Sequence, residues 1–263
     1  MELNICHLYP DILNLYGDRG NIITMKRRLE GRGIKVNIDE CSIGQPLNAD
    51  KYDIFFIGGG QDFEQEVLLR DLSSGKAQDI RTAVEEEKTF LAICGGYQLL
   101  GDVVSDPENT EGGGSLRGMK LLPIDTVFRP SKTTTQTRGT LLEIDGVLSD
   151  LSGLAVEGYE IHMGETVRDA SAKPLVRLLR REGEIEDGCQ TENAFGTYLH
   201  GVFDAPEAAL RTAQALAQKK GVTLTGEALD THAYKEQQYD KLADSVRKSL
   251  DMERIYRIME GKA

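Results

Sequence analysis

Long apolar runs are absent from this sequence of 263 residues, although 40% of its residues are hydrophobic. No stretch approaches the roughly 18 consecutive apolar residues that indicate a membrane-spanning helix. The N-terminal stretch MELNICHLYP also lacks the basic start and the long apolar core of a signal peptide. These absences argue against a transmembrane or secreted protein and predict a cytoplasmic location.

Cysteine and histidine are scarce, with four residues of each type. The cysteines are widely spaced and form no CxxC pair, so neither a zinc site nor any other metal site is predicted. Basic residues are outnumbered by acidic ones, which gives a formal net charge of −12. An acidic surface repels nucleic acid, so binding to nucleic acid is not expected.

The first hundred residues alternate between apolar runs and amphipathic stretches. Strand-length apolar runs are LNICHLY, YDIFFIGGG and TFLAIC, and IKVNIDEC alternates like a strand. Helical spacing lies between them, in GNIITMKRRLEGRG and DIRTAVEEEK. Strands that are apolar on both faces and alternate with helices predict an α/β fold with an open, mostly parallel sheet flanked by helices.

The rest of the chain has weaker patterns. Residues 104–117 are polar and glycine-rich, which predicts a loop, and several shorter strand-like stretches follow. The C-terminal part has helical spacing, with one apolar stripe that predicts core packing, made of Tyr239, Leu242, Ala243, Val246 and Leu250. Because no internal repeat and no long linker occur, a single domain over residues 1–263 is predicted, including the C-terminal helices.

Cys94 directly follows the strand-like run TFLAI and precedes Gly95 and Gly96. Ligands of an open parallel sheet bind beyond the carboxyl ends of its strands. A tight strand-to-helix turn exposes a nucleophile, and a helix N-terminus favours the thiolate form of a cysteine. The pattern therefore favours a reactive thiolate; the alternative is a buried cysteine whose glycines merely fit the turn.

A thiolate nucleophile usually needs an acid–base partner, and two histidines follow strand-like stretches. His162 ends GYEIH, and His200 ends NAFGTYLH. The glycines of IGGG (residues 58–60) end a strand that is expected to neighbour the Cys94 strand. Their backbone N–H groups and that of Gly95 are candidates for an oxyanion hole. The alternative for the glycine triplet is an ordinary turn.

Taken in order, the strand ending in GGG, FLAICGGYQLLG, GYEIHMG and GTYLHGVF resemble the class I glutamine amidotransferases of the cobyric-acid-synthase (CobB/CobQ) type. The resemblance covers nearly the whole chain and implies a flavodoxin-like three-layer sandwich with glutaminase activity. Within that family, LYPDILNLYGDRGN, the chain length and the YDKLADSVRKSLD tail are similar to GatD, the glutaminase subunit of lipid II isoglutaminyl synthase.

This resemblance implies that Cys94 is the nucleophile and that His200 is its acid–base partner. Further contacts to the oxyanion and to glutamine are implied for Gly59, Gly60, Gly95 and Gln98. Arg129 in TVFRP is the candidate for binding the glutamine carboxylate, because a guanidinium can hold a carboxylate with two hydrogen bonds. The alternative for Arg129 is an ordinary surface residue.

The sequence departs from the family at one position. Many class I amidotransferases have a glutamate two residues after the catalytic histidine, and here that position is Val202. The prediction is therefore either a Cys–His dyad or a third residue from elsewhere in the chain. Glu160 and Asp204 are the candidates for this third member.

A phosphate-binding GxxxxGK[ST] stretch is absent, so no cofactor is predicted in this chain. The resemblance implies that ATP and Mg²⁺ bind to a MurT-like Mur-ligase subunit in a heterodimer. That partner would use the ammonia to amidate D-glutamate in the stem peptide of lipid II, at the inner face of the membrane, in peptidoglycan synthesis. Because the motifs begin close to residue 1, the partner is expected to be a separate polypeptide.

Three alternatives remain from the sequence. A different synthetase partner, such as a corrinoid amidation system, would leave the catalytic residues unchanged. A stand-alone cysteine hydrolase would need neither partner nor glutamine. A catalytically silent regulatory subunit would keep the fold and would form no adduct at Cys94 with a glutamine-like electrophile.

Overall fold

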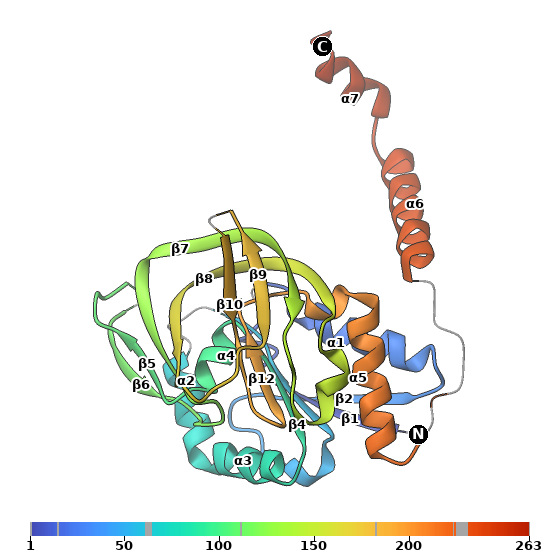
Figure 1. Cartoon of the computed structure of the whole chain (residues 1–263). Coiled ribbons are helices and arrows are strands. Elements are labelled where there is room, and N and C mark those ends of the chain that lie inside the picture. Colours follow the sequence, from blue (N-terminus) through green and yellow to red (C-terminus); the bar gives the residue numbers. More distant parts are fainter. Residues whose placement is uncertain are drawn as a thin grey trace. The chain divides into compact units, whose positions relative to one another are not determined.

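The structure is a computed structural model that describes residues 2–14, 16–60, 65–110, 112–181, 183–222, 224 and 231–262 (Figure 1). The chain divides into two compact units, Met1–Gly226 and Glu227–Ala263. The first unit contains two sheets and the helices that cover them, and the second unit is helical. The prediction of one domain over residues 1–263 stays a prediction.

A mostly parallel sheet forms the centre of the first unit, with strand order β11-β12-β4-β3-β1-β2. Its strands are β1 (Glu2–Leu8), β2 (Lys35–Cys41), β3 (Ile54–Ile57), β4 (Thr89–Ile93), β12 (Ala194–Thr197) and the antiparallel edge strand β11 (Cys189–Gln190). Every residue of β3 and β4 is buried, which explains why continuous apolar runs encode these strands. The predicted open, mostly parallel sheet is confirmed.

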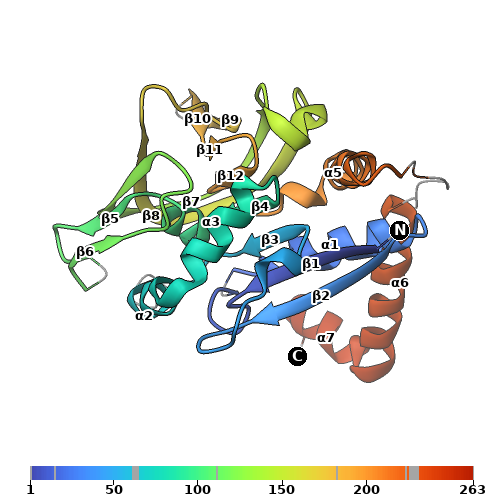
Figure 2. The same ribbon diagram turned by 90° about the horizontal axis from the view of Figure 1, so that it is seen from below.

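Helices cover both faces of this sheet (Figure 2). The connections contain α1 (Arg19–Glu30), η1 (Ala49–Lys51), α2 (Gln65–Asp71), the π-helical turn η3 (Leu72–Lys76), α3 (Ala77–Glu85) and α4 (Gly95–Leu99). Because crossovers between parallel strands are right-handed in nearly all proteins, α1 and α3 lie on opposite faces of the sheet. α5 (Pro206–Lys219) packs beside α1. The arrangement is a three-layer α/β sandwich, as predicted.

A second sheet is built from the middle of the chain, with strand order β10-β9-β7-β5-β6 and with β8 paired to β7. Its strands are β5 (Val103–Asp106), β6 (Gly114–Arg117), β7 (Ile124–Leu141), β8 (Ala155–Arg168), β9 (Val176–Arg180) and β10 (Gly183–Asp187), and the turns η4 (Gly146–Leu151) and η5 (Val202–Asp204) complete this unit. The loop prediction for residues 104–117 is wrong at both ends, where β5 and β6 pair antiparallel, and it is confirmed for the described residues that connect these two strands. β6 has no buried residue, so its sequence lacks a strand's apolar pattern.

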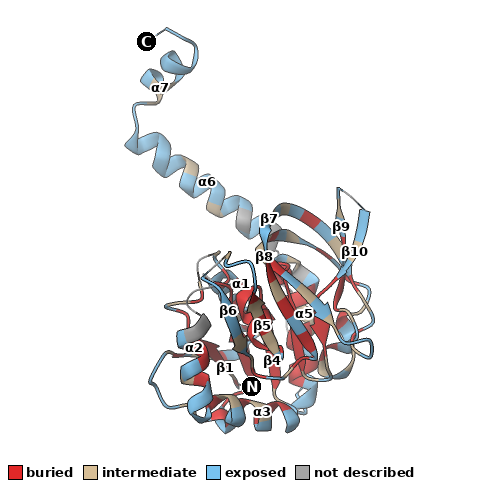
Figure 3. Ribbon diagram, turned by 90° about the vertical axis from the view of Figure 1, so that its left-hand side faces the viewer, coloured by how far each residue is buried: buried red, intermediate tan, exposed pale blue. Residues whose placement is uncertain are grey.

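The second unit contains α6 (Thr231–Ser249) and α7 (Met252–Met259). The large residues of the predicted apolar stripe, which lie on α6 and directly after it, are between 40% and 62% exposed (Figure 3). The stripe therefore does not form a packed core within this unit, contrary to the prediction. Across the described part of the chain, no helix is both long enough and apolar enough to span a membrane.

His7 lies within β1 and is almost completely buried, with its ring against the edge of Phe56. Burial lowers the pKa of His7 from 6.5 to about 4, and the nearby Arg19 adds to this effect. As the pH falls below 6.5, the unfolded chain therefore takes up a proton before the folded chain does. This difference in proton uptake lowers the free energy of unfolding by about 3 kcal/mol as the pH falls from 7 to 4.

We therefore expect His7→Phe to remove this part of the acid sensitivity, because phenylalanine fills the same apolar site without titrating. The measurement is the urea-derived unfolding free energy of both proteins at several values between pH 7 and pH 4. As the pH falls from 7 to 4, the unfolding free energy of the variant should rise by about 3 kcal/mol relative to that of the wild-type protein. A difference between the two proteins that does not change with pH would contradict the assignment.

Candidate active site

Cys94 occupies a sharp turn between β4 and α4. Its backbone has φ 53° and ψ −114°, a conformation that non-glycine residues rarely adopt. The turn is held from both sides, since the Cys94 N–H donates to the Thr197 carbonyl at 2.9 Å and the Cys94 carbonyl accepts from the Gln98 N–H at 3.0 Å. This strand–turn–helix geometry is the one that the sequence predicts for a nucleophile.

Glycines allow the end of β3 to approach this turn. The Gly96 N–H donates to the Gly58 carbonyl at 3.0 Å, and a Cβ on Gly96 would lie 2.8 Å from that carbonyl oxygen. A Cβ on Gly59 would lie 2.9 Å from the Cys94 Cβ and 3.2 Å from its Sγ. Because glycine has no Cβ, the backbone at the end of β3 can lie directly beside the thiol.

His200 follows β12 and is fully buried. Its Nδ1 lies 2.7 Å from Oδ1 of Asp18, so Nδ1 carries a hydrogen that it donates to the carboxylate. The other oxygen of Asp18, Oδ2, accepts from the Gly59 N–H at 2.7 Å. His200 Nε2 has no hydrogen-bond partner among the described residues, which leaves a buried nitrogen to accept a proton.

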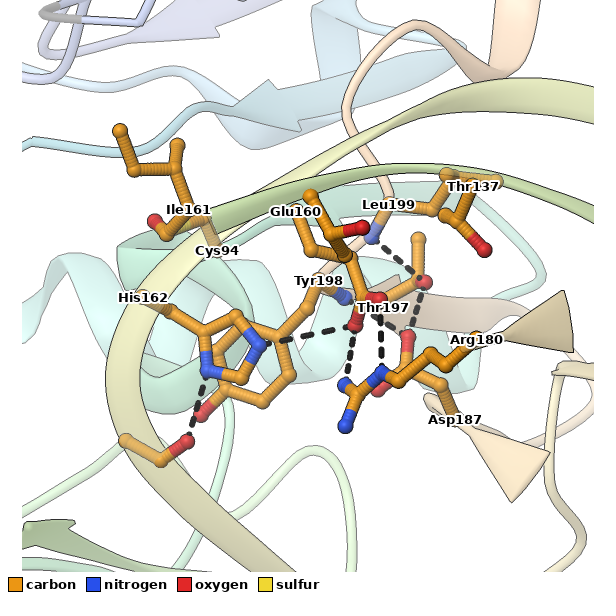
Figure 4. Close-up of polar contacts among 12 residues, drawn as sticks. Cys94, Thr137, Glu160, Ile161, His162, Arg180, Asp187, Thr197, Tyr198 and Leu199 are labelled. Atoms are coloured by element: carbon orange, nitrogen blue, oxygen red, sulfur yellow. Dashed lines mark hydrogen bonds and ion pairs between the residues drawn. The ribbon is translucent and has the colours of Figure 1, made fainter. Parts of the chain in front are cut away.

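Two sets of contacts bring Cys94 and His200 to the same place. Cys94 Sγ and Asp18 Oδ2 each lie 3.2 Å from the position that a Cβ on Gly59 would occupy, and Asp18 holds His200. On the other side, Tyr159 of β8 forms a backbone bridge with His200. The Ile161 carbonyl of β8 accepts from Cys94 Sγ at 3.6 Å, and both residues are labelled in Figure 4. The predicted nucleophile and acid–base residue thus share one site.

Two aromatic rings fix the plane of the His200 imidazole. Tyr159 stacks on it with a centroid distance of 4.8 Å and an interplanar angle of 3°, and Tyr16 contacts it edge-on at 5.7 Å. The Tyr159 hydroxyl donates to the Tyr16 carbonyl, which ties the two aromatic residues together. Burial, together with the carboxylates of Asp18 and Asp204, raises the pKa of Tyr159, so this hydroxyl stays a donor.

The third member of the site is Asp18, which the sequence patterns do not identify. Asp204 is exposed on η5, and Glu160 is paired with Arg180, so neither candidate is the carboxylate on His200. Both candidates are close in sequence to a histidine, but neither carboxylate forms the hydrogen bond to the His200 imidazole. One feature of the sequence could have identified Asp18. It is the acidic residue of LYGDRGN, which comes shortly after the first strand, and the carboxyl end of a parallel strand faces the site.

The predicted oxyanion glycines have different positions. The structure corrects the role of Gly59, because its N–H is already donated to Asp18. Gly95 is the first residue of α4, and the N–H groups of a first helical turn have no acceptor within the helix. Gly60 is buried, and Gly58 and Gly59 separate it from the end of β3. The roles of Gly60 and Gly95 as oxyanion donors stay predictions.

The two predicted glutamine-binding side chains lie in contrasting environments. Gln98 is buried one turn after Cys94, and its Nε2 donates to the Tyr198 hydroxyl at 3.2 Å. Arg129 lies on β7 with 44% of its side chain exposed, and its guanidinium pairs with Glu165 at 2.9 Å and Glu108 at 3.5 Å. Arg129 is thus engaged by two carboxylates at the surface of the second sheet. Binding of the glutamine carboxylate stays a prediction.

Comparisons with known proteins agree with this geometry. Residues 4–208 match the family described as CobB/CobQ-like glutamine amidotransferase domain. A cobyric acid synthase of Lachnoclostridium phytofermentans is 41% identical over 198 residues, which cover 71% of this chain and 39% of that protein. A cobyric acid synthase of Citrobacter koseri is 43% identical over 197 residues, covering 74% and 38% respectively. This chain therefore spans less than half the length of these relatives.

A solved structure supports the fold. In the structure of PurLQS from Thermotoga maritima, a chain of 18% identity superposes with a TM-score of 0.57 and covers 84% of this chain and 100% of its own length. A likeness at this identity concerns the fold alone, and it agrees with the predicted α/β class. Sequence match, fold and elbow cysteine together place this chain in the CobB/CobQ-like glutamine amidotransferase family.

Proposed function

We propose that this chain hydrolyses glutamine with Cys94 as the nucleophile, His200 as the acid–base residue and Asp18 as the positioning residue of His200. The observation that carries the proposal is the hydrogen bond from His200 Nδ1 to Asp18. It fixes the tautomer in which Nε2 is a proton acceptor, in the same buried site as the strained Cys94 turn. A thiol beside such a nitrogen has the partner that cysteine hydrolases need.

The reaction then proceeds in two stages. His200 Nε2 takes the thiol proton, and the Cys94 sulfur attacks the side-chain amide carbon of glutamine. Backbone N–H groups near Gly60 and Gly95 stabilise the oxyanion. The C–N bond breaks as His200 returns the proton to the departing nitrogen, which releases ammonia and leaves a thioester on Cys94. Water, deprotonated by the same nitrogen, attacks the thioester and releases glutamate and the free thiol.

The ammonia must reach a second active site before it is protonated in bulk water. An ATP-dependent synthetase is therefore the proposed consumer, with ATP and Mg²⁺ bound outside this chain. Because the similar proteins are cobyric acid synthases, the favoured acceptor is a corrinoid carboxylate, and the product is its amide. The predicted MurT-like partner and lipid II acceptor find no support among these relatives.

The decisive experiment supplies glutamine labelled with ¹⁵N at its amide to this chain, ATP, a corrinoid carboxylic acid and a corrinoid-amidating synthetase. Mass spectrometry of the corrinoid should show a gain of label that disappears with Cys94→Ala. A parallel reaction contains lipid II and a MurT-like ligase instead, and it should remain unlabelled.

Label in lipid II and not in the corrinoid would overturn the acceptor. If glutamine is hydrolysed but neither the corrinoid nor lipid II gains label, the chain is a glutaminase, and both proposed acceptors are wrong. A mixture that amidates from free ammonia but never from glutamine would show a silent subunit, and the catalytic proposal would then fail.

A further inference from the structure

The chain from the end of β12 to His200 is buried. Thr197 is the last residue of β12, and the three residues that follow it, Tyr198, Leu199 and His200, are each at most 3% exposed. Buried backbone N–H groups need acceptors, and the parallel ladder between β12 and β4 ends at Thr197. The place of the acid–base imidazole therefore depends on the groups that accept hydrogen bonds from this segment.

Asp187, the last residue of β10, holds this segment (Figure 4). Its Oδ2 atom accepts from the Thr197 hydroxyl at 2.5 Å and from the Tyr198 N–H at 2.9 Å. The Thr197 hydroxyl oxygen in turn accepts from the Leu199 N–H at 3.0 Å. One carboxylate oxygen thus holds the chain directly at two residues and, through the hydroxyl, at a third.

The same segment is joined to the nucleophile. The Thr197 carbonyl accepts from the Cys94 N–H at 2.9 Å, so the residue that Asp187 holds also holds the strained turn of the thiol. The Tyr198 hydroxyl accepts from Gln98 Nε2 at 3.2 Å, which ties the next residue to the helix that follows Cys94. Asp187 is therefore connected both to the turn that carries the thiol and to the chain that leads to the acid–base residue.

The chain crosses from the second sheet to the first directly after Asp187. Cys189 begins β11, the edge strand beside β12, and Gly188 is the residue between. Gly188 has φ 75°, and a Cβ there would lie 2.5 Å from the Gly196 carbonyl oxygen. Glycine is the residue that allows the backbone to approach β12 this closely at a positive φ. The crossing thus brings the Asp187 side chain against the end of β12.

Loss of the Asp187 side chain would leave two buried donors without this acceptor, the Thr197 hydroxyl and the Tyr198 N–H. The backbone that carries these donors would then shift toward other acceptors. Burial, together with the nearby Glu160 carboxylate, raises the pKa of Asp187, although hydrogen bonds from both donors oppose this effect. Alanine at this position removes the acceptor oxygen, and asparagine keeps one without an ionisable group, so the two substitutions separate hydrogen bonding from charge.

We propose that Asp187 is a positioning residue of the glutaminase site: its carboxylate holds the chain after β12 and so sets the place of His200 relative to Cys94. The inference rests on the proposed function, because this placement matters only if the thiol and the imidazole react together. Asp187 acts through the residues that it holds and takes no part in proton transfer.

The test compares the rates at which Cys94 of the full chain reacts with acivicin, an electrophilic glutamine analogue, and with iodoacetamide. Labelling of the Cys94 peptide is followed by mass spectrometry, since the chain has four cysteines. We expect Asp187→Ala to slow the acivicin reaction about 10²-fold, because misplaced reacting groups lose their alignment. Iodoacetamide needs no bound pose, so its rate should stay within about threefold of wild type.

Two further variants are the controls. Asp187→Asn should keep the acivicin rate within about fivefold of wild type, because its amide oxygen can accept both hydrogen bonds. Asp53→Ala is the matched control, since the Asp53 carboxylate also accepts a backbone N–H, from Asn4 at 2.8 Å, but Asp53 precedes β3 at the end of the sheet opposite to the thiol. Its loss should lower stability without changing the ratio of the two rates.

Equal acivicin rates in Asp187→Ala and wild type would refute the inference and leave the proposed function standing. An Asp187→Asn protein as slow as Asp187→Ala would also refute it, because the hydrogen bonds would then not set the alignment. An equal slowing in Asp53→Ala would show a general loss of stability and would overturn the positioning role.

A wild-type protein that reacts with iodoacetamide, but neither hydrolyses glutamine nor reacts with acivicin, would refute the proposed function and this inference with it. If Asp187→Ala does not fold, Thr197→Val takes its place, because it removes the hydroxyl that Asp187 holds. The acivicin reaction of that variant should be slower by at least about tenfold, and an unchanged rate would overturn the inference.

Discussion

Replacement of Cys94 by alanine is expected to lower glutamine hydrolysis by at least about 10⁴-fold, because no other described nucleophile has a comparable position. The thiol lies at the carboxyl end of β4 and beside the Gly59 backbone, whose N–H donates to the carboxylate that holds His200. Loss of the sulfur removes the atom that forms the thioester, while the backbone of the turn is unchanged. Amidation from free ammonia by an added synthetase should persist.

A second variant at the same position separates chemistry from backbone strain. Cys94 has a positive φ, which glycine adopts at little cost and alanine does not. Cys94→Gly should therefore be more stable than Cys94→Ala by about 1–3 kcal/mol, although glycine normally destabilises a folded chain relative to alanine. Both variants should be equally inactive.

The measurement is urea unfolding of the two variants together with a glutamate-release assay. The two variants are controls for each other, since both lack the same sulfur and they differ only in one methyl group. A Cys94→Ala protein at least as stable as Cys94→Gly would show that the turn is unstrained. Residual hydrolysis in either variant near the wild-type rate would remove Cys94 from the mechanism.

The sequence predicts the elements that are encoded locally. β3 and β4 are buried on both faces, so each appears as an unbroken apolar run, and the Cys94 turn is encoded by two glycines immediately after such a run. β6 has no buried residue, and β7 changes register between Phe128 and Thr133. Their patterns are therefore broken or absent, and the sequence predicts the second sheet only as short separate strands.

The residues of the site also fall into two groups, those that the local sequence identifies and those that only the fold brings together. Cys94 and His200 lie at the ends of recognisable strands, and the family resemblance identifies both. Asp18 meets His200 across 182 positions of sequence, so no local spacing connects them. The competing use of the Gly59 N–H by Asp18 is equally non-local. Contacts of this kind depend on the order of strands in the sheet, which the periodicity of one segment does not contain.

Asp18→Asn is expected to lower kcat for glutamine hydrolysis by about 10³- to 10⁴-fold with little change in KM. The amide can still accept the Gly59 N–H through its oxygen, which preserves the fold of the loop. Its NH₂ group would then face His200 Nδ1 and donate to it. That contact selects the tautomer with a hydrogen on Nε2, and such a ring cannot take the proton from Cys94.

The control is Asp204→Asn, which neutralises the exposed sequence-predicted candidate and should keep activity within about twofold of wild type, as most surface substitutions have small effects. Steady-state hydrolysis of both variants decides between a triad and a dyad. If Asp18→Asn retains full activity, a Cys–His dyad is sufficient and Asp18 only supports the fold. Removal of the exposed Asp204 carboxylate should leave the His200 tautomer unchanged. If Asp204→Asn nevertheless loses activity as well, the carboxylates of Asp18 and Asp204 both contribute to the function of His200, and the assignment to Asp18 alone is wrong.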